Sequence, residues 1–184
     1  MGLFLIPTFP FFFYKTYGNK KIILKPNTIL ISNHYSNFDP FFIQMRFLFK
    51  DIRFVTLRDV KKKLHLRFIA WLFNAVYVDP SRADVTFFKE AMSALKNGSI
   101  LCIFPEGVVN PRKFGFFDFK MGYIKLAFKA NSTIVPIYLY PALKAFKRSK
   151  IHILNAIEIS CTTLEPSDLN AKIQSDIMEV SSSY

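Results

Sequence analysis

The sequence predicts an α/β domain with a mostly parallel central sheet covered by helices on both faces. Short apolar runs alternate with longer segments of helical spacing along nearly the whole chain. Runs such as 100–104 are apolar at every position, which is typical of a strand buried on both faces of a sheet. A length of 184 residues without internal repeats or linkers fits a single domain with a sizeable core.

The first half of the chain is expected to hold four strands and two helices. The strands are short apolar runs bounded by turn residues, and they cover 22–24, 28–32, 53–57 and 76–78. The first helix, 40–49, begins at Asp39-Pro40, because proline suits the first helical position and the Asp39 carboxylate can cap free N–H groups. The second helix, 61–75, carries an apolar stripe and several lysines. This helix either packs on the sheet or lies in a lipid headgroup layer, and both alternatives stay open.

The second half is expected to alternate in the same way. Helix 84–96 stops at Asn97-Gly98, and helix 118–129 stops at Asn131. A closing helix covers 166–180. The strands of this half are the apolar runs at 99–104, 133–140 and 151–159.

Charge and hydropathy point to an anionic surface that also accepts apolar groups. Hydrophobic residues make up 51% of the chain, mean hydropathy is +0.21, and 25 Lys+Arg against 13 Asp+Glu give a net charge of +12. The cytoplasmic leaflet of a membrane has both properties. Nucleic acid is the competing anion, but the chain has no nucleic-acid-binding motif and is too apolar for that class. The two distant cysteines, Cys102 and Cys161, are expected to be small core residues. Neither these cysteines nor the three scattered histidines form a metal-ligand cluster.

Residues 1–21 are expected to form an apolar and basic membrane-associating segment that precedes a domain at 22–184. Residues 1–14 are almost wholly apolar but are shorter than the ~20 residues of a spanning helix, and Pro7 and Pro10 interrupt them. They therefore suggest an interfacial anchor or a stretch that covers the core. The expected location is the cytoplasmic face of the membrane, peripheral or shallowly inserted.

Two polar turns that follow apolar runs carry the candidate chemistry. His34 and Asp39 follow the run 28–31, and Glu106 and Gly107 follow the run 101–104. An imidazole has an ordinary pKa near ~6.5, which suits proton transfer at neutral pH. A carboxylate on its second nitrogen fixes the tautomer and stabilises the imidazolium. In parallel sheets such sites form at the carboxyl ends of strands. Asp39 as a simple helix cap, with His34 as an ordinary polar residue, is the alternative interpretation.

The two turns together resemble the PlsC-like glycerolipid acyltransferases, the 1-acyl-sn-glycerol-3-phosphate acyltransferase family. Asn33-His34 with Asp39 is similar to the family's N-H-x-x-x-x-D block, and 104–107 is similar to its F-P-E-G block. Weaker similarities lie at 73–82, 119–122 and 134–137, so the resemblance covers roughly residues 22–160. The resemblance implies the glycerol-3-phosphate-acyltransferase-like fold. It also implies that His34 is a general base oriented by Asp39, and that Glu106 and Gly107 bind the acceptor.

Two departures from the family pattern concern the cations that would hold the acceptor's phosphate. Val108 to Pro111 separate Gly107 from Arg112, where the family has Thr-Arg or Ser-Arg, and Arg82 is displaced from Asp79 by two residues. The candidate phosphate ligands are Arg82, Arg112, Lys113 and Lys120.

The implied activity is O-acyl transfer from an acyl thioester to the free hydroxyl of a lysophospholipid, first of all 1-acyl-glycerol-3-phosphate, in phospholipid biosynthesis. The expected partners are membrane lipid and an acyl donor, either coenzyme A thioester or acyl carrier protein, with no other cofactor, no metal and no nucleic acid. Two alternatives stay open. One is an acyltransferase for another lysolipid, and the other is a non-catalytic peripheral membrane protein of the same fold.

Overall fold

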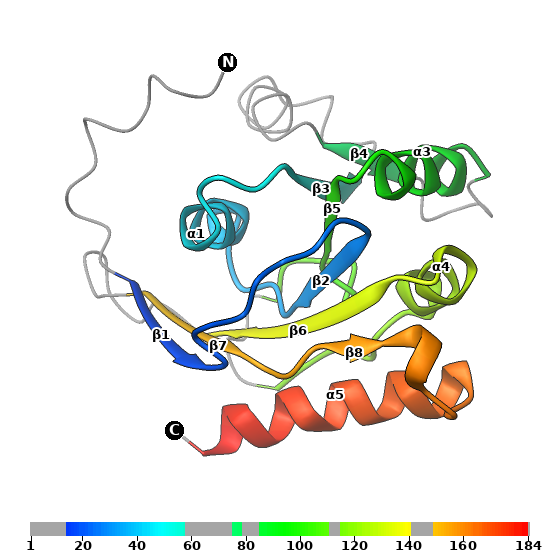
Figure 1. Ribbon diagram of the computed structural model, residues 1–184. Helices are drawn as coiled ribbons and strands as arrows, with labels where there is room; N and C mark the ends of the chain where they lie inside the picture. Colours follow the sequence, from blue (N-terminus) through cyan, green and yellow to red (C-terminus); the bar gives the residue numbers. More distant parts are fainter. Residues whose placement is uncertain (1–13, 58–74, 79–84, 111–114, 141–148, 184) are drawn as a thin grey trace.

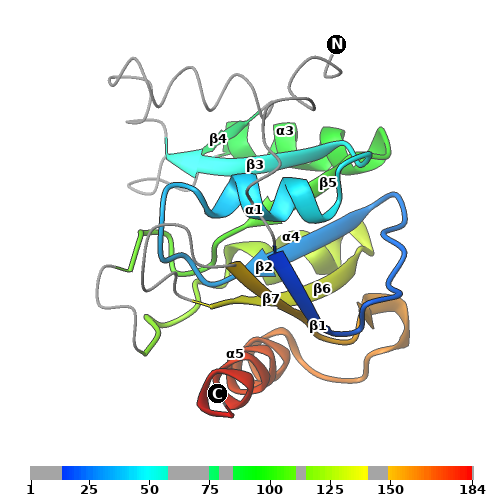
Figure 2. The same ribbon diagram turned by 90° about the vertical axis from the view of Figure 1, so that its left-hand side faces the viewer.

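The computed structural model describes residues 14–57, 75–78, 85–110, 115–140 and 149–183, and its centre is an eight-stranded sheet (Figures 1 and 2). The spatial order is β1-β7-β6-β2-β5-β3-β4, and β8 pairs with β6 off this path. The strands are β1 (Tyr14–Gly18), β2 (Thr28–Ser32), β3 (Ile52–Leu57), β4 (Val76–Val78), β5 (Ile100–Ile103), β6 (Thr133–Leu139), β7 (Ser149–Ile153) and β8 (Ile157–Glu158).

Five neighbouring strands, β6, β2, β5, β3 and β4, run parallel, and β7 and β8 pair antiparallel with β6. The carboxyl ends of the five parallel strands therefore lie along one edge of the sheet. The register pairs Ile31 of β2 with Ile103 of β5, so these two strands end side by side. This topology confirms the predicted mostly parallel α/β domain.

Helices cover both faces of the sheet, as expected. The described helices are α1 (Asp39–Arg46), α3 (Val85–Lys96), α4 (Gly122–Ala130) and α5 (Pro166–Ser182), and a 3-10 turn covers Ile159–Cys161. Buried residues of α3, α4 and α5 pack in one cluster with the sheet residues Ile29, Ile31 and Ile134. Ile43 and Phe47, from α1 and its C-cap, pack on the opposite face with Leu30 and Val135. Successive residues of β2 thus enter opposite cores, which explains its uninterrupted apolar run.

Several expected elements differ in extent. Tyr14–Gly18, expected as the end of the N-terminal segment, forms the edge strand β1 beside β7, so the sheet begins before the predicted boundary at 22. Residues 22–24 form no strand. The expected strand 151–159 is broken at 154–156 into β7 and β8, and Cys161, expected in the core, is exposed. The expected helix 61–75 and residues 1–13 fall almost wholly outside the described residues, so their membrane roles stay predictions.

Local stop signals are confirmed at two helices. Asn131 caps α4 in the left-handed region at φ +48°, and the N–H of the cap bonds to carbonyls of the last turn. Helix α3 ends at Lys96, followed by Gly98 at φ +85°. Their left-handed backbone ends each helix and lets the chain turn into the next parallel strand.

Replacing Gly18 with alanine is expected to destabilise the fold. Gly18 ends β1 at φ +69°, where an alanine Cβ would collide with the carbonyl oxygen of Ile153 and with the His152 ring. The left-handed backbone alone costs an L-residue about 1–2 kcal/mol, so we expect a loss of more than about 2 kcal/mol in the free energy of unfolding.

The matched control is Gly122→Ala at the start of α4, where an added Cβ meets nothing within 4 Å. This variant is expected to be neutral or to stabilise the protein by up to about 1 kcal/mol. Denaturant unfolding measures both changes. Equal stabilities of the two variants would contradict the assigned edge-strand geometry.

Candidate active site

The predicted site residues that the structure describes are brought together at the carboxyl edge of the parallel strands. His34 follows β2 by one residue, and Glu106 follows β5 after Phe104 and Pro105. The His34 backbone N–H donates to the Glu106 carboxylate at 3.1 Å. The two motifs, which are 72 positions apart in the chain, therefore form one site, as the resemblance implied.

Asn33 fixes the direction in which β2 delivers His34. Its side chain is fully buried and pairs with the backbone of Leu139 in both directions. The Asn33 Nδ2 donates to the Leu139 carbonyl at 2.9 Å, and the Leu139 N–H donates to Asn33 Oδ1 at 2.7 Å. An amide that both donates and accepts can replace a strand residue, so the β2–β6 ladder continues past Ser32.

The His34 imidazole pairs with the Asp39 carboxylate. The distance from His34 Nδ1 to Asp39 Oδ2 is 3.0 Å, and the two side chains are 16% and 7% exposed. An ionised carboxylate only accepts hydrogen bonds, so Nδ1 is the protonated nitrogen of the neutral ring. The lone pair is then on Nε2, to which no described residue donates a hydrogen bond.

Backbone groups of the turn that follows His34 also hold the Asp39 carboxylate. Its Oδ2 also accepts from the backbone N–H groups of Tyr35, at 2.7 Å, and Ser36, at 2.8 Å. Three donors thus converge on one oxygen of this carboxylate. Asp39 is itself the first residue of α1, and no side chain caps this helix. The helix-cap interpretation of Asp39 is therefore wrong, because its carboxylate turns back to the residues before the helix.

The Glu106 carboxylate is buried and bound by protein donors. It is 2% exposed, and both of its carboxylate oxygens are occupied. Oε1 accepts from His34 N–H, and Oε2 accepts from Phe117 N–H at 3.0 Å and from Asn110 Nδ2 at 3.1 Å. A carboxylate that is buried and bound by three protein donors is not presented to an acceptor hydroxyl in this conformation.

Gly107 and Lys120 are packed against each other. Gly107 adopts φ +73°, and a Cβ added there would lie 2.6 Å from Lys120 Nζ. The Lys120 N–H donates to the Pro105 carbonyl at 3.0 Å, which fixes the lysine beside the Pro105–Gly107 turn. Lys120 is thus the one predicted phosphate ligand that the described structure brings to the site. Arg82, Arg112 and Lys113 lie outside the described residues.

Two residues that contribute to the site, Asn110 and Phe104, were not assigned a role from the sequence. The buried Asn110 donates its backbone N–H to the His34 carbonyl at 2.6 Å, besides its bond to Glu106. The Phe104 ring stacks on the His34 ring, with centroids 4.0 Å apart and planes at 16°. In the sequence Asn110 only separates Gly107 from Arg112, and no motif assigned it a function. Phe104 was part of a quoted motif, but stacking depends on the side-by-side ends of β2 and β5.

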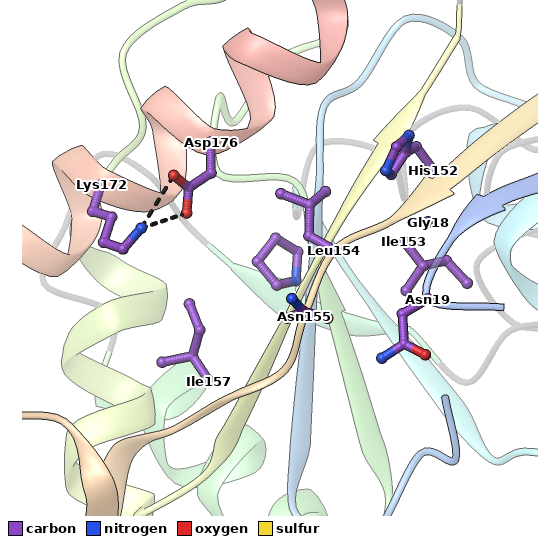
Figure 3. Close-up of a pocket in the computed structure, with 10 residues that line it drawn as sticks. Gly18, Asn19, His152, Ile153, Leu154, Asn155, Ile157, Lys172 and Asp176 are labelled. Atoms are coloured by element: carbon purple, nitrogen blue, oxygen red, sulfur yellow. Dashed lines mark hydrogen bonds and ion pairs between the residues drawn. The ribbon is translucent and has the colours of Figure 1, made fainter. Parts of the chain in front are cut away.

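A cavity of about 730 Å³ lies between α5 and the β1–β7 edge of the sheet (Figure 3). His152, Asn19 and the Lys172–Asp176 ion pair line it, with a distance of 2.9 Å between Nζ and Oδ2 of that pair. Burial lowers the pKa of His152 below its ordinary value, because the charged form loses solvation. None of His34, Asp39 and Glu106 lines this cavity, so it is separate from the candidate active site.

The geometry defines a class of protein: an α/β domain with a histidine that a carboxylate orients at the carboxyl edge of its parallel strands. A family model described as Acyltransferase matches residues 14–140. The chain belongs to this acyltransferase family, and the resemblance stated from its motifs is confirmed.

Two curated relatives carry more specific names. A probable 1-acyl-sn-glycerol-3-phosphate acyltransferase of Mycoplasma pneumoniae is 25% identical over 146 residues, which cover 72% of this chain and 54% of the relative. A 1-acyl-sn-glycerol-3-phosphate acyltransferase of Borreliella burgdorferi is 28% identical over 127 residues, which cover 67% and 49%. The chain therefore spans about half the length of the curated relatives it matches.

A solved structure shares the fold. The crystal structure of the 1-acyl-sn-glycerophosphate (LPA) acyltransferase PlsC from Thermotoga maritima superposes with a TM-score of 0.68 at 19% identity. The match covers 91% of this chain and 70% of the other. Among the residues that the structure describes, no helix has the length and apolarity needed to cross a bilayer.

Proposed function

We propose that this protein transfers a fatty acyl group from an acyl thioester to the hydroxyl of a lysophospholipid, with 1-acyl-glycerol-3-phosphate as the favoured acceptor. The single observation that carries the proposal is the His34 Nδ1–Asp39 hydrogen bond, which leaves the lone pair of Nε2 facing away from the carboxylate. Family membership and the names of the two curated relatives support the reaction class and the acceptor.

The reaction needs one proton carrier and no acyl-enzyme. Nε2 of His34 takes the acceptor's hydroxyl proton as the oxygen attacks the thioester carbonyl. The carbon–sulfur bond then breaks, and the imidazolium returns the proton to the departing thiolate, so that alcohol and thioester become ester and thiol. Asp39 stabilises the imidazolium between these two steps. Ser36 supplies a backbone donor to Asp39, and its hydroxyl accepts from Phe38 N–H, so no step requires a serine nucleophile.

The direct test is an acyl-transfer assay on the purified protein with a panel of substrates. Labelled acyl-coenzyme A and acyl carrier protein serve as donors, and several lysolipids serve as acceptors. Preference for lysophosphatidate supports the proposed acceptor, and preference for another lysolipid supports the alternative suggested by the missing Thr-Arg. Vesicle binding without turnover of any pair would instead support a non-catalytic membrane module.

The net charge of +12 supports a peripheral location on an anionic membrane surface, which we propose is the cytoplasmic face.

We expect Lys120→Ala, Arg82→Ala and Arg112→Ala to raise the KM for a phosphate-bearing acceptor by roughly tenfold or more each, because charge-assisted hydrogen bonds to phosphate are lost. The position of Lys120 beside Gly107 supports its inclusion among these cations. Lys50→Ala, at an exposed lysine after α1, is the control and is expected to leave KM unchanged. If none of the three substitutions changes the KM, the phosphate assignment is wrong.

A further inference from the structure

A groove of about 910 Å³ runs between α3 and α4 on the outside of the helical layer. The two helices contact each other and lie side by side on the same face of the sheet (Figure 1). Val85, Phe88 and Met92 form the apolar part of its lining. These residues are separate from the α3 side chains that enter the core, which are Phe87, Ala91, Ala94 and Leu95. Phe88 and Met92 pack against that core but are only half-buried, and Val85 is 63% exposed. Helix α3 therefore presents to the groove an apolar stripe that the fold covers only in part.

Four lysines, Lys89 and Lys96 from α3 and Lys125 and Lys129 from α4, also line this groove. Among the described residues, none of their ammonium groups pairs with a carboxylate, and Lys129 lies over the Phe88 ring at 5.6 Å. An apolar strip flanked by unpaired cations is complementary to a ligand with an apolar face and acidic edges.

The spacing of the cations favours an extended ligand over a compact phosphate group. Lys89 and Lys96 are seven residues apart, which places them roughly 10 Å apart along a helix. A pyrophosphate is held by converging donors, whereas these lysines follow the length of the groove. A helix has a diameter of about 10–12 Å and enters such a groove with its apolar face. A flat bilayer would meet the lysines but would leave the concave apolar lining unfilled.

The topology also places one end of the groove toward the sheet edge that carries His34. Helices α3 and α4 precede the parallel strands β5 and β6, so each helix runs back from the carboxyl edge of the sheet to the amino edge. The Val85 end of the groove therefore lies toward the edge that carries His34.

We propose that the α3–α4 groove docks an acidic amphipathic helix of a protein partner, namely the carrier protein that brings the acyl thioester. This inference rests on the proposed function for the partner's role, because of the two expected donor types only a carrier protein presents a helix. Coenzyme A thioester would then serve as a donor that does not use the groove.

The test compares charge-reversal variants that alter net charge equally. The groove variants are Lys89→Glu with Lys96→Glu, and Lys125→Glu with Lys129→Glu. The control is Lys20→Glu with Lys21→Glu, at exposed lysines outside the groove. Calorimetry measures the affinity of each protein for unacylated acyl carrier protein at low and high salt. Steady-state kinetics then compare acyl carrier protein with acyl-coenzyme A as the donor.

We expect the wild type and the control to bind the carrier protein in a salt-sensitive manner and the groove variants to bind it about tenfold or more weakly, since like charges would face one another. The KM for the carrier-borne donor should rise by a similar factor, and kcat/KM for acyl-coenzyme A should not change. Equal carrier affinity in all variants would overturn the proposal. So would groove variants that lose binding only to phosphatidylglycerol–phosphatidylcholine vesicles.

The two proposals fail separately in this experiment. If the wild type turns over acyl-coenzyme A but does not bind the carrier protein, the docking surface is wrong and the proposed function remains. If the carrier protein binds through the groove but no donor supports turnover, the docking surface remains and the proposed function is wrong.

Discussion

Replacing His34 with alanine is expected to lower the rate of acyl transfer by about 10²- to 10⁴-fold, because the reaction loses its general base. The loss should fall on kcat, since the imidazole acts on the hydroxyl proton as the bond forms. The ring is 16% exposed, and its backbone bonds to Glu106 and Asn110 do not involve the side chain. The variant should therefore fold, and circular dichroism with thermal unfolding verifies this before kinetics are compared.

Asp39→Asn tests the same pair from the other side. The amide keeps the size of the carboxylate but replaces one acceptor oxygen by a donor, and Oδ2 now receives three hydrogen bonds. We expect a loss in kcat within the same range, because the imidazolium is no longer stabilised and Nδ1–H loses its acceptor.

The control for both variants is Ser36→Ala, which removes the nearest hydroxyl of the turn and is expected to change turnover by less than about tenfold. A large loss in Ser36→Ala would indicate an acyl-enzyme, contrary to the proposed mechanism. Near-normal turnover in His34→Ala would show that His34 is not the general base and would contradict the proposed mechanism.

The local part of the site could be predicted from the sequence, and the long-range part could not. His34 and Asp39 are five positions apart, and one turn joins them, so residue types and spacing were sufficient. The apolar runs of β2 and β5 placed His34 and Glu106 at the same sheet edge, because parallel strands share their carboxyl ends.

The edge strand β1 shows what local signals leave out. Tyr14–Gly18 includes a lysine and ends in glycine, and it becomes a strand by pairing with Ser149–Ile153, far along the chain. Edge strands depend on such pairing more than on their own propensity. The sequence also could not predict which groups the Glu106 carboxylate contacts. Two of its three donors are backbone N–H groups, which almost any residue could supply.

Glu106→Gln is expected to lower kcat by about 10- to 100-fold while the KM for the acceptor stays within about threefold of the wild type, because the carboxylate positions His34 and does not bind substrate. The expectation rests on the burial of Glu106 and on its bonds to His34 N–H, Phe117 N–H and Asn110 Nδ2. Glutamine has one acceptor oxygen and presents its NH₂ to donors, so at least one buried donor loses its partner. Each buried donor left without an acceptor costs about 1–3 kcal/mol, and the melting temperature should fall accordingly.

A loss of stability alone does not distinguish a positioning role from a structural role. Two readouts make the distinction: the division of the effect between kcat and KM, and the NMR signals of the His34 ring. In the wild type, the NMR signals of the His34 imidazole should show the proton on Nδ1, where Asp39 accepts it. In Glu106→Gln the His34 backbone loses its bond to Oε1, so the ring signals should shift or broaden at a temperature where the protein is still folded.

Asn110→Asp is the companion variant, because it places a second carboxylate against Glu106 and removes the Nδ2 donor while retaining the backbone bond to the His34 carbonyl. It should lower kcat in the same direction. An acceptor-binding Glu106, as the family resemblance implied, predicts the opposite division: a KM for the acceptor raised tenfold or more, with unchanged His34 signals.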